Sequence, residues 1–283
     1  MKKIWAVARG EYLCWFLQPR MLIIGVLLIF MQNLAIEPLL ERAAKMEIPM
    51  NGLEPFVAVG NSGQLVMLIP FVFLILLSDY PRMSSNSLLQ ISRTGRLTWL
   101  AGQLLFLCFA ILTYLSMILA GSLIFAGVNF SSMEWSDAVT KYNSVFPDEY
   151  GNFASMLLPS NLYNQIPLIK AFVLTFGYLF LYLFLLSLVL YVFKLTQMPT
   201  IGLIFEVFLI ACGVLSCALR TKLMWAFPMA HTIPWLHYEE ILKKPIVPIW
   251  LTNAYWAAAI AIGLVGNIIA VRRYNFLTLD ARR

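Results

Sequence analysis

Six apolar runs of membrane length determine what this chain can fold into. They lie at 21–40, 64–78, 98–125, 168–193, 201–219 and 249–271; the second is the shortest and can begin as early as Phe56. About 20 mostly apolar residues cross the hydrocarbon core of a bilayer as a helix. Backbone polar groups in lipid must be paired within the protein, and these runs do not alternate as barrel strands do. The sequence therefore predicts an all-α integral membrane protein with six transmembrane helices.

Composition agrees with this class and excludes others. Of the 283 residues, 61% are hydrophobic and only 12% are charged, whereas a soluble domain averages about 25% charged residues. The basic excess is expected to meet anionic lipid headgroups and not nucleic acid. The four cysteines have neither metal-ligand nor CxxC spacing, so no disulfide framework is predicted.

The distribution of Lys and Arg predicts the orientation. One side of the six spans carries twelve of them against three acidic residues, and the other carries eight against ten. The twelve are Lys2, Lys3, Arg9, Arg20, Arg82, Arg93, Arg96, Lys194, Arg272, Arg273, Arg282 and Arg283. The positive-inside rule then places both termini in the cytoplasm. The connection 220–248 disagrees, because it would place Arg220, Lys222, Lys243 and Lys244 outside.

The two ends of the chain are predicted to lie at the cytoplasmic face. Residues 1–20 are expected to form an amphipathic helix in the membrane interface, before Pro19 turns the chain into the first span. The residues of its apolar face are Ile4, Trp5, Ala8, Tyr12, Trp15 and Phe16. A disordered basic tail is the alternative for this stretch. Residues 272–283 are expected to form a cytoplasmic tail.

Two connections are predicted to lie outside. The segment 127–167 is rich in aromatic residues, so we expect a small ordered cap and not a structureless loop. The segment 220–248 mixes prolines with apolar residues and is expected to form short helices at the outer interface. In the last span the pairs Ala254/Ala258 and Ala259/Gly263 are typical of a close approach by another helix.

The connection 79–97, between the second and third spans, has too many structural signals for a simple turn. Pro81 ends the preceding helix, and Ser84 or Ser85 is a suitable N-cap for a helix over 86–92 that carries Leu88 and Leu89. Gly95, between Arg93 and Arg96, is typical of a helix C-terminus. We expect a short helix below the headgroups; a helix that merely rests on the bilayer is the alternative.

Motifs for chemistry are weak or absent. No Gly-Lys dipeptide occurs, so the chain has no phosphate-binding loop and no ATP site of its own. Gly60-Asn61-Ser62-Gly63 matches the GxSG of intramembrane proteases, with His231 or His237 as the base, but both histidines fall in a loop. His231, His237, Glu239 and Glu240 match no known metal spacing. We therefore predict no catalytic and no metal-binding residues, and solvated histidines.

Glu206 lies inside the fifth span, where a carboxylate is costly. It is a candidate pathway or gating residue, or else it hydrogen-bonds to a neighbouring span. A secondary transporter, which needs coupling charges at membrane depth, is the main alternative function.

The arrangement as a whole resembles the permease subunits of type-2 ATP-binding-cassette (ABC) exporters. The shared features are the amphipathic N-terminal helix, the structured connection 79–97, six spans and the segment 220–248. The acidic run that many members carry before the coupling helix is absent, and the segment 127–167 is unusually long. In having that long segment, the chain is similar to peptide exporters of Gram-positive bacteria, including those for phenol-soluble modulins.

The resemblance implies a non-catalytic subunit of the bacterial plasma membrane that exports an amphipathic or hydrophobic substrate, with a peptide favoured. It implies two copies of a separate ATPase, which bind ATP and Mg, a second identical or homologous permease subunit, and no cofactor in this chain. The connection 79–97 would hold the coupling helix that docks into the ATPase. The ATPase-coupling residues carried over are Asp79, Tyr80, Ser84, Leu88, Leu89, Arg93 and Arg96. The docking contacts would lie within 84–96, and Asp79 and Tyr80, with Pro81, would set the exit angle of the helix.

Overall fold

The structure is a computed structural model. It describes residues 1–63, 65–82, 85–127, 133–239 and 245–273, with the side chains of 85–88 outside the description. Within these ranges, every named secondary-structure element is a helix.

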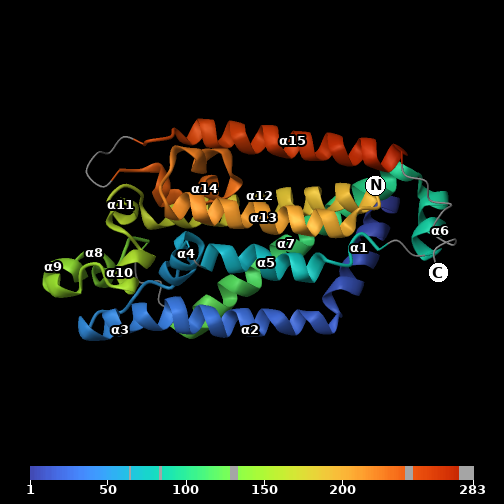
Figure 1. Ribbon diagram of the computed structural model, residues 1–283. Coiled ribbons are helices and arrows are strands. Elements are labelled where there is room, and N and C mark those ends of the chain that lie inside the picture. The colour runs from blue at the N-terminus through green and yellow to red at the C-terminus, as the bar shows by residue number, and fades with distance from the viewer. Residues whose placement is uncertain (64, 83–84, 128–132, 240–244, 274–283) are drawn as a thin grey trace.

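Long apolar helices lie side by side with their axes roughly parallel (Figure 1). In the described ranges, five are long and apolar enough to cross a membrane, and α4 with α5 makes a sixth candidate that is bent by 84°. The candidates are Pro19–Lys45, α4 (Glu54–Asn61) with α5 (Leu65–Leu77), α7 (Arg96–Ala126), α12 (Leu168–Leu195), α13 (Pro199–Ala218) and α15 (Ile249–Arg273). The prediction of an all-helical, multi-pass membrane protein is confirmed.

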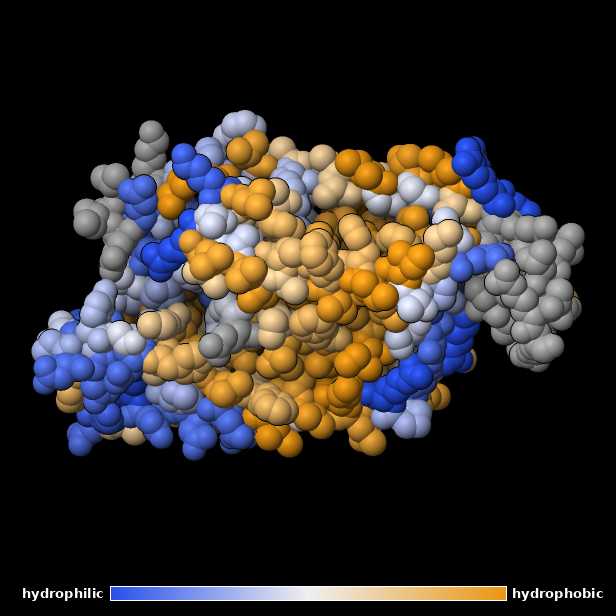
Figure 2. Space-filling view, viewed as in Figure 1, coloured by the Kyte–Doolittle hydropathy of each residue, from blue (hydrophilic) through white to orange (hydrophobic). Residues whose placement is uncertain are grey.

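Short elements gather at the two ends of this bundle. At one end, called here the α6 end, lie α1 (Lys2–Phe16), α6 (Ser85–Thr94) and the last turn of α15 (Figure 1). The opposite end, called the cap end, holds the other short helices. They are α8 (Asp137–Thr140), α9 (Tyr142–Val145), η3 (Pro147–Glu149), α10 (Phe153–Leu157), α11 (Ser160–Tyr163), η4 (Lys222–Ala226), α14 (Pro228–Thr232) and η5 (Pro234–His237). Figure 2 shows a broad hydrophobic band between hydrophilic surfaces at the two ends.

The first two candidate spans are not simple helices. The first consists of η1 (Pro19–Met21), α2 (Leu22–Met31), η2 (Gln32–Ile36) and α3 (Glu37–Lys45), and η2 is a π-helical turn. Pro38, which lacks a backbone N–H, is the second residue after η2. The second candidate is longer than the predicted run 64–78, because α4 precedes it. It is interrupted where Asn61 and Ser62 end α4, and Ser62 has extended backbone angles.

α1 packs along α7 instead of lying free of the bundle. A Cβ atom at Gly102 of α7 would lie 2.7 Å from Val7 Cβ, so only glycine permits this approach. The apolar face predicted for α1 is thereby divided. Ala8 and Trp15 are buried in the protein, whereas Trp5 and Phe16 are exposed. The side chains of α1 that face the protein are Val7, Ala8, Glu11 and Trp15.

The cap, defined here as α8 to α11 with η3, is held to α4 through one carboxylate. Glu54 is completely buried and accepts hydrogen bonds from Ser136 N at 2.6 Å, Ser136 Oγ at 2.9 Å and Asn51 N at 3.0 Å. Trp135 Nε1 donates to the Ile166 carbonyl at 2.7 Å, which ties the start of the cap to its end. The long segment after α7 is therefore ordered in its described part, residues 133–167.

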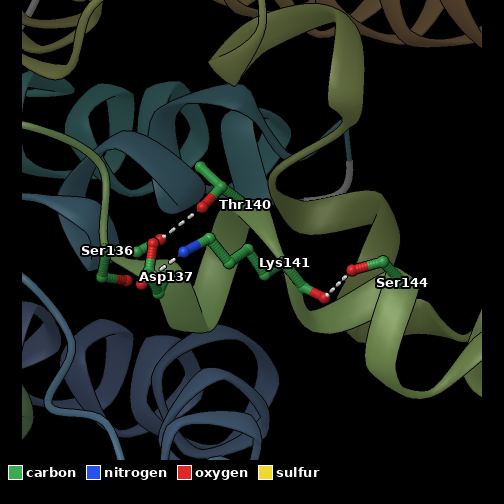
Figure 3. Close-up of polar contacts among 5 residues, drawn as sticks. All are labelled: Ser136, Asp137, Thr140, Lys141 and Ser144. Atoms are coloured by element: carbon green, nitrogen blue, oxygen red, sulfur yellow. Dashed lines mark hydrogen bonds and ion pairs between the residues drawn. The ribbon is translucent and has the colours of Figure 1, made fainter.

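The cap helices are short and stabilised by local polar contacts (Figure 3). Thr140 Oγ1 donates to the Ser136 carbonyl at 3.1 Å, and Lys141 Nζ lies 2.9 Å from Asp137 Oδ2. Ser144 Oγ donates to the Lys141 carbonyl at 2.6 Å and helps to begin α9. One-turn helices have too few internal hydrogen bonds to be stable alone, so these contacts and the anchor at Glu54 supplement them.

Part of the small-residue pattern in α15 serves packing within the chain. A Cβ atom at Gly263 would lie 3.0 Å from Leu188 Cδ1 of α12, so this glycine is in contact with the chain's own bundle. Ala254 and Ala258 are exposed and remain open to another helix.

Candidate functional site

α6 lies outside the bundle at one end, set off from α7 by a single residue (Figure 1). That residue, Gly95, has φ +87°, a backbone conformation that favours glycine. The helix predicted over 86–92 therefore occurs as α6, one residue longer at the start and two at the end. Ser84 lies outside the described residues, and so does the side chain of Leu88.

One face of α6 packs into an apolar cluster that it shares with four other helices. Ile91 is buried in an apolar cluster to which each of these helices contributes. The other members are Val7 of α1, Trp99 and Leu100 of α7, Leu195 of α12, and Ala270 and Val271 of α15. Any displacement of α6 that keeps this cluster intact must also move the parts of the four helices that form it.

Two polar contacts reinforce this anchor. Lys3 Nζ donates to the Arg93 carbonyl at 3.0 Å, which joins the N-terminus of α1 to the last turn of α6. The guanidinium of Arg96, the first residue of α7, donates to the Arg272 carbonyl near the end of α15 and so joins these two helices beside the cluster. Both cations thus donate to carbonyl groups at helix C-termini, which lack hydrogen-bond partners within their own helix.

The opposite face of α6 is open. Leu89 is 57% exposed, and Ser92 and Arg93 are also exposed. Single exposed leucines are ordinary, but here one stands next to a cation on a helix that projects from the bundle. The arrangement presents an apolar and a basic group to whatever lies beyond the α6 end.

Asp79 and Tyr80 are not part of this open face. Asp79 Oδ2 lies 2.7 Å from Arg20 Nη1, where the chain enters the first span. Tyr80 is fully buried, its ring centroid lies 5.0 Å from that of Phe106, and the guanidinium of Arg82 lies over the ring at 4.9 Å. The contacts of these two residues hold the path of the connection, which agrees with the role in setting the exit angle of the helix expected for them.

Glu11 is a buried polar residue that the sequence analysis did not anticipate. Its carboxylate accepts a hydrogen bond from Gln103 Nε2 at 3.2 Å, and Tyr191 OH donates to Gln103 Oε1 at 3.3 Å. Burial raises the pKa of Glu11, and the bond from Gln103 opposes that rise. The spacing of Val7, Glu11 and Trp15 at intervals of four was the signal available in the sequence.

Glu206 is fully buried in α13. Neither carboxyl oxygen has a hydrogen-bond partner of good geometry, although the backbone of Leu190 in α12 is close by. The sequence offered two interpretations of Glu206, a pathway or gating residue and a hydrogen bond to a neighbouring span. The lack of a well-formed hydrogen bond favours the first. An uncompensated carboxylate is costly, so the group is neutral or meets a partner in another state of the protein.

The histidines at the cap end are buried, which contradicts the prediction that they are solvated. His231 and His237 are 3% and 2% exposed. His231 bonds through Nε2 to the Trp225 carbonyl at 3.0 Å and through Nδ1 to Thr252 Oγ1 at 3.1 Å. His237 bonds through Nδ1 to the Ile233 carbonyl at 3.2 Å and through Nε2 to Thr252 Oγ1 at 2.9 Å. The prediction treated the segment as a surface loop, but it packs against α12 and α13, and its two histidines bond to Thr252 of α15.

These contacts determine the tautomers. Each backbone carbonyl requires an N–H, so the two ring nitrogens that face Thr252 are bare when both rings are neutral. The threonine hydroxyl has one proton and satisfies only one of them. The other nitrogen is where a proton adds when the pH falls, and burial lowers the pKa of both rings, that of His237 to about 4.

These hydrogen bonds bear on the two alternative chemistries, a serine protease and a metal site. All four ring nitrogens contact Thr252 or a backbone carbonyl, and none contacts Ser62, so the arrangement contains no serine–histidine dyad. Within the described ranges, no group of three or more His, Cys, Asp and Glu side chains could hold a metal ion.

Comparisons of the chain with protein-family models, with curated proteins and with solved structures find no match.

Proposed function

We propose that this chain is the permease subunit of an ATP-driven exporter and that α6 is the helix through which a separate ATPase subunit moves it. The observation that carries the proposal is the position of α6. One face is anchored to α1, α7, α12 and α15, and the other presents Leu89 and Arg93 outward. A partner bound to the open face can therefore transmit a displacement to the cluster that these four helices share.

The distribution of charge supports the same assignment. Lys3, Arg93, Arg96 and Arg272 lie together at the α6 end. Under the positive-inside rule this end faces the cytoplasm, where ATP is available. The chain lacks a phosphate-binding loop, so the ATPase and its Mg belong to another subunit. Two permease subunits, identical or homologous, would enclose the pathway.

The proposal is tested by removing the contacts of α6 without touching its anchor. The tagged chain is purified in mild detergent from membranes of its source cells. ATP hydrolysis is measured, and subunits carrying a phosphate-binding loop are identified by mass spectrometry. We expect Leu89→Asp combined with Arg93→Glu to abolish recovery of the ATPase, because an acidic pair replaces an apolar and a basic contact.

The matched control is Arg9→Glu, which makes the same charge reversal on exposed α1 at the same end. It should leave the complex intact. Both variants alter exposed side chains and should change the free energy of unfolding by no more than about 0.5 kcal/mol. An ATPase that stays bound to the α6 variant, or the lack of any ATPase in the unaltered preparation, would contradict the proposal.

A secondary transporter is the second candidate, and Glu206 is the observation that favours it. A buried carboxylate without a good hydrogen bond can take up and release a coupling proton. In proteoliposomes that contain this chain alone, uptake driven by a proton gradient and lost in Glu206→Gln would support this candidate. Transport that requires ATP and the second subunit would exclude it.

A further inference from the structure

A cavity of about 910 Å³ lies at the cap end of the bundle. Its wall is formed by the break between α4 and α5, by the cap, by the last turns of α13, by residues between Arg220 and Glu239, and by Ile246. Pockets of about 300–1,000 Å³ are typical of sites for small molecules. The cavity is at the opposite end from α6 and has no part in the docking contacts proposed above.

Much of the wall is apolar and aromatic, and its shape is fixed by hydrogen bonds. The large apolar side chains include Phe153, Met156, Met224, Trp225, Trp235 and Leu236. Trp235 Nε1 donates to the Asn61 carbonyl at 2.9 Å. Asn161 Nδ2 donates to the carbonyls of Trp235 and Tyr238, each at 3.1 Å. The cavity is therefore largely preformed.

Two cations, Arg220 and Lys222, line the same cavity directly after α13. Arg220 adopts φ +48°, and its guanidinium lies over the Trp235 ring at 5.7 Å. No ion pair with either side chain occurs among the described residues. Glu239 is also in the wall, so these charged residues leave a single net positive charge, which suits one anionic group better than several.

The approach to the cavity is apolar. Leu215, Leu219 and Leu223 are each more than 60% exposed and flank the lining residues Ala218 and Lys222 along the chain. Since α13 is an apolar candidate span, we expect this exposed strip to face lipid; the two cations lie between Leu219 and Leu223 along the chain. A chain from the bilayer can follow the strip while its charged group remains at Arg220 and Lys222.

We propose that this cavity binds a single-chain anionic amphiphile. The apolar chain lies among Trp225, Trp235 and Met224, and its carboxylate or phosphate lies at Arg220 and Lys222. This inference deepens the proposed function, on which it rests for the claim that the bound amphiphile is the exported substrate. The binding itself requires neither an ATPase nor ATP.

Two tryptophans in the wall provide the measurement. The purified permease, without any ATPase and in a detergent free of heavy atoms, is titrated with a dibrominated fatty acid or a dibrominated lysophosphatidate. Bromine quenches indole fluorescence on contact. We expect saturable quenching with both anions, at least tenfold weaker affinity for the dibrominated methyl ester, and loss of most of the quenching in the double variant Trp225→Phe, Trp235→Phe.

The variant Arg220→Gln, Lys222→Gln should weaken binding of the anions at least tenfold and leave the methyl ester unaffected. Its control is Lys141→Gln, Lys170→Gln, which removes two exposed charges at the same end but outside the cavity. Ala218→Phe, which narrows the cavity and leaves the cations in place, should also weaken binding. Unfolding temperatures confirm that each variant is folded.

Equal affinity for anion and ester, or quenching that never saturates, would overturn the proposal. A third outcome is that neither the fatty acid nor the lysophosphatidate binds, but an amphipathic peptide with a free C-terminal carboxylate does. The cavity would then be a peptide site, and the proposal would be overturned. The two proposals fail separately. Binding that persists in a preparation that never yields an ATPase removes only the exporter, and an intact complex without binding removes only the cavity site.

Discussion

The two ends of the molecule use charge in opposite ways. At the α6 end, Lys3 and Arg96 donate to backbone carbonyls, and Leu89 and Arg93 are exposed on a helix outside the bundle. At the cap end, Glu54, His231 and His237 are buried, and their hydrogen bonds hold short segments in place. The first arrangement leaves groups available to a partner; the second uses its polar groups to build an internal structure around a cavity.

The difference predicts which substitutions are costly. A buried charged group that satisfies several donors cannot be removed without leaving those donors unpaired. An exposed group on α6 can be replaced with little effect on stability, because water takes its place. Variants of the buried polar residues at the cap end should therefore affect folding, and variants on the open face of α6 should affect assembly.

The largest effect is expected for Glu54→Ala at the cap end. It removes the acceptor of three hydrogen bonds and leaves the backbone N–H groups of Asn51 and Ser136 unpaired. We expect the free energy of unfolding in detergent to fall by about 4 kcal/mol and the cap to become sensitive to protease. The control is Glu41→Gln, an exposed residue of α3 near the same end, which should change stability by less than about 0.5 kcal/mol. Equal effects for the two would contradict the role assigned to Glu54.

Acidic pH should destabilise the cap end next most strongly. The pKa of His237 is lowered by burial to about 4, below its usual 6.5, so the unfolded chain binds more protons between these values. The contribution of His237 to the free energy of unfolding is therefore complete above about pH 6.5. About 3 kcal/mol of it is lost as the pH falls toward 4. Chemical unfolding measured across this range should show the slope, and His237→Asn should remove most of it. Equal slopes for the original chain and His237→Asn between pH 7 and 4 would exclude a buried neutral His237.

The α6 end should respond to pH with the opposite sign. Burial raises the pKa of Glu11, so the stability it contributes is present at acidic pH and is lost as the pH rises through that raised pKa. Glu11→Gln keeps an acceptor for Gln103 and should be more stable than the original chain at neutral pH. The same unfolding series measures both ends.

A smaller effect is expected where α1 meets α7. Gly102→Leu places a side chain where Val7 and the Ile4 carbonyl already lie, at 2.7 Å and 3.1 Å from the first added carbon. Overpacking of this kind costs about 2 kcal/mol, and part of that cost should appear as release of α1, detected by protease cleavage near Gly10. Gly177→Ala in α12 is the control, because its added carbon meets nothing within 4 Å. It should be neutral or slightly stabilising, as alanine favours helices.

Prediction from the sequence succeeded where local rules apply. Membrane-length apolar runs, Pro81, Ser85 and Gly95 predicted the long helices and the short helix α6, because hydrophobic length and capping act within a few residues of the chain. The early start of the second span near Phe56 also agrees with α4. The break at Asn61 and Ser62 was visible only as a Gly-Asn-Ser-Gly stretch, which the sequence analysis compared with a protease motif.

Prediction was weakest for buried polar residues. Glu11 was not among the residues of the apolar face predicted for α1, and His231 and His237 were expected in water. Nothing in their sequence neighbours specifies Gln103, Tyr191 or Thr252, which lie at least 15 positions away and meet them only after the helices have packed. The face that α1 turns toward α7 likewise depended on Gly102, far along the chain.

By itself, then, the sequence determined that this chain is helical, that it has the length and apolar content to cross a membrane several times, and that it carries no nucleotide-binding loop. These are consequences of composition and of short-range periodicity. Only the tertiary structure decided that α6 shares an apolar cluster with four other helices, that both histidines bond to Thr252, and that Arg220 and Lys222 line a cavity. Each depends on residues distant in sequence, which become neighbours because the helices bury their apolar surfaces against one another.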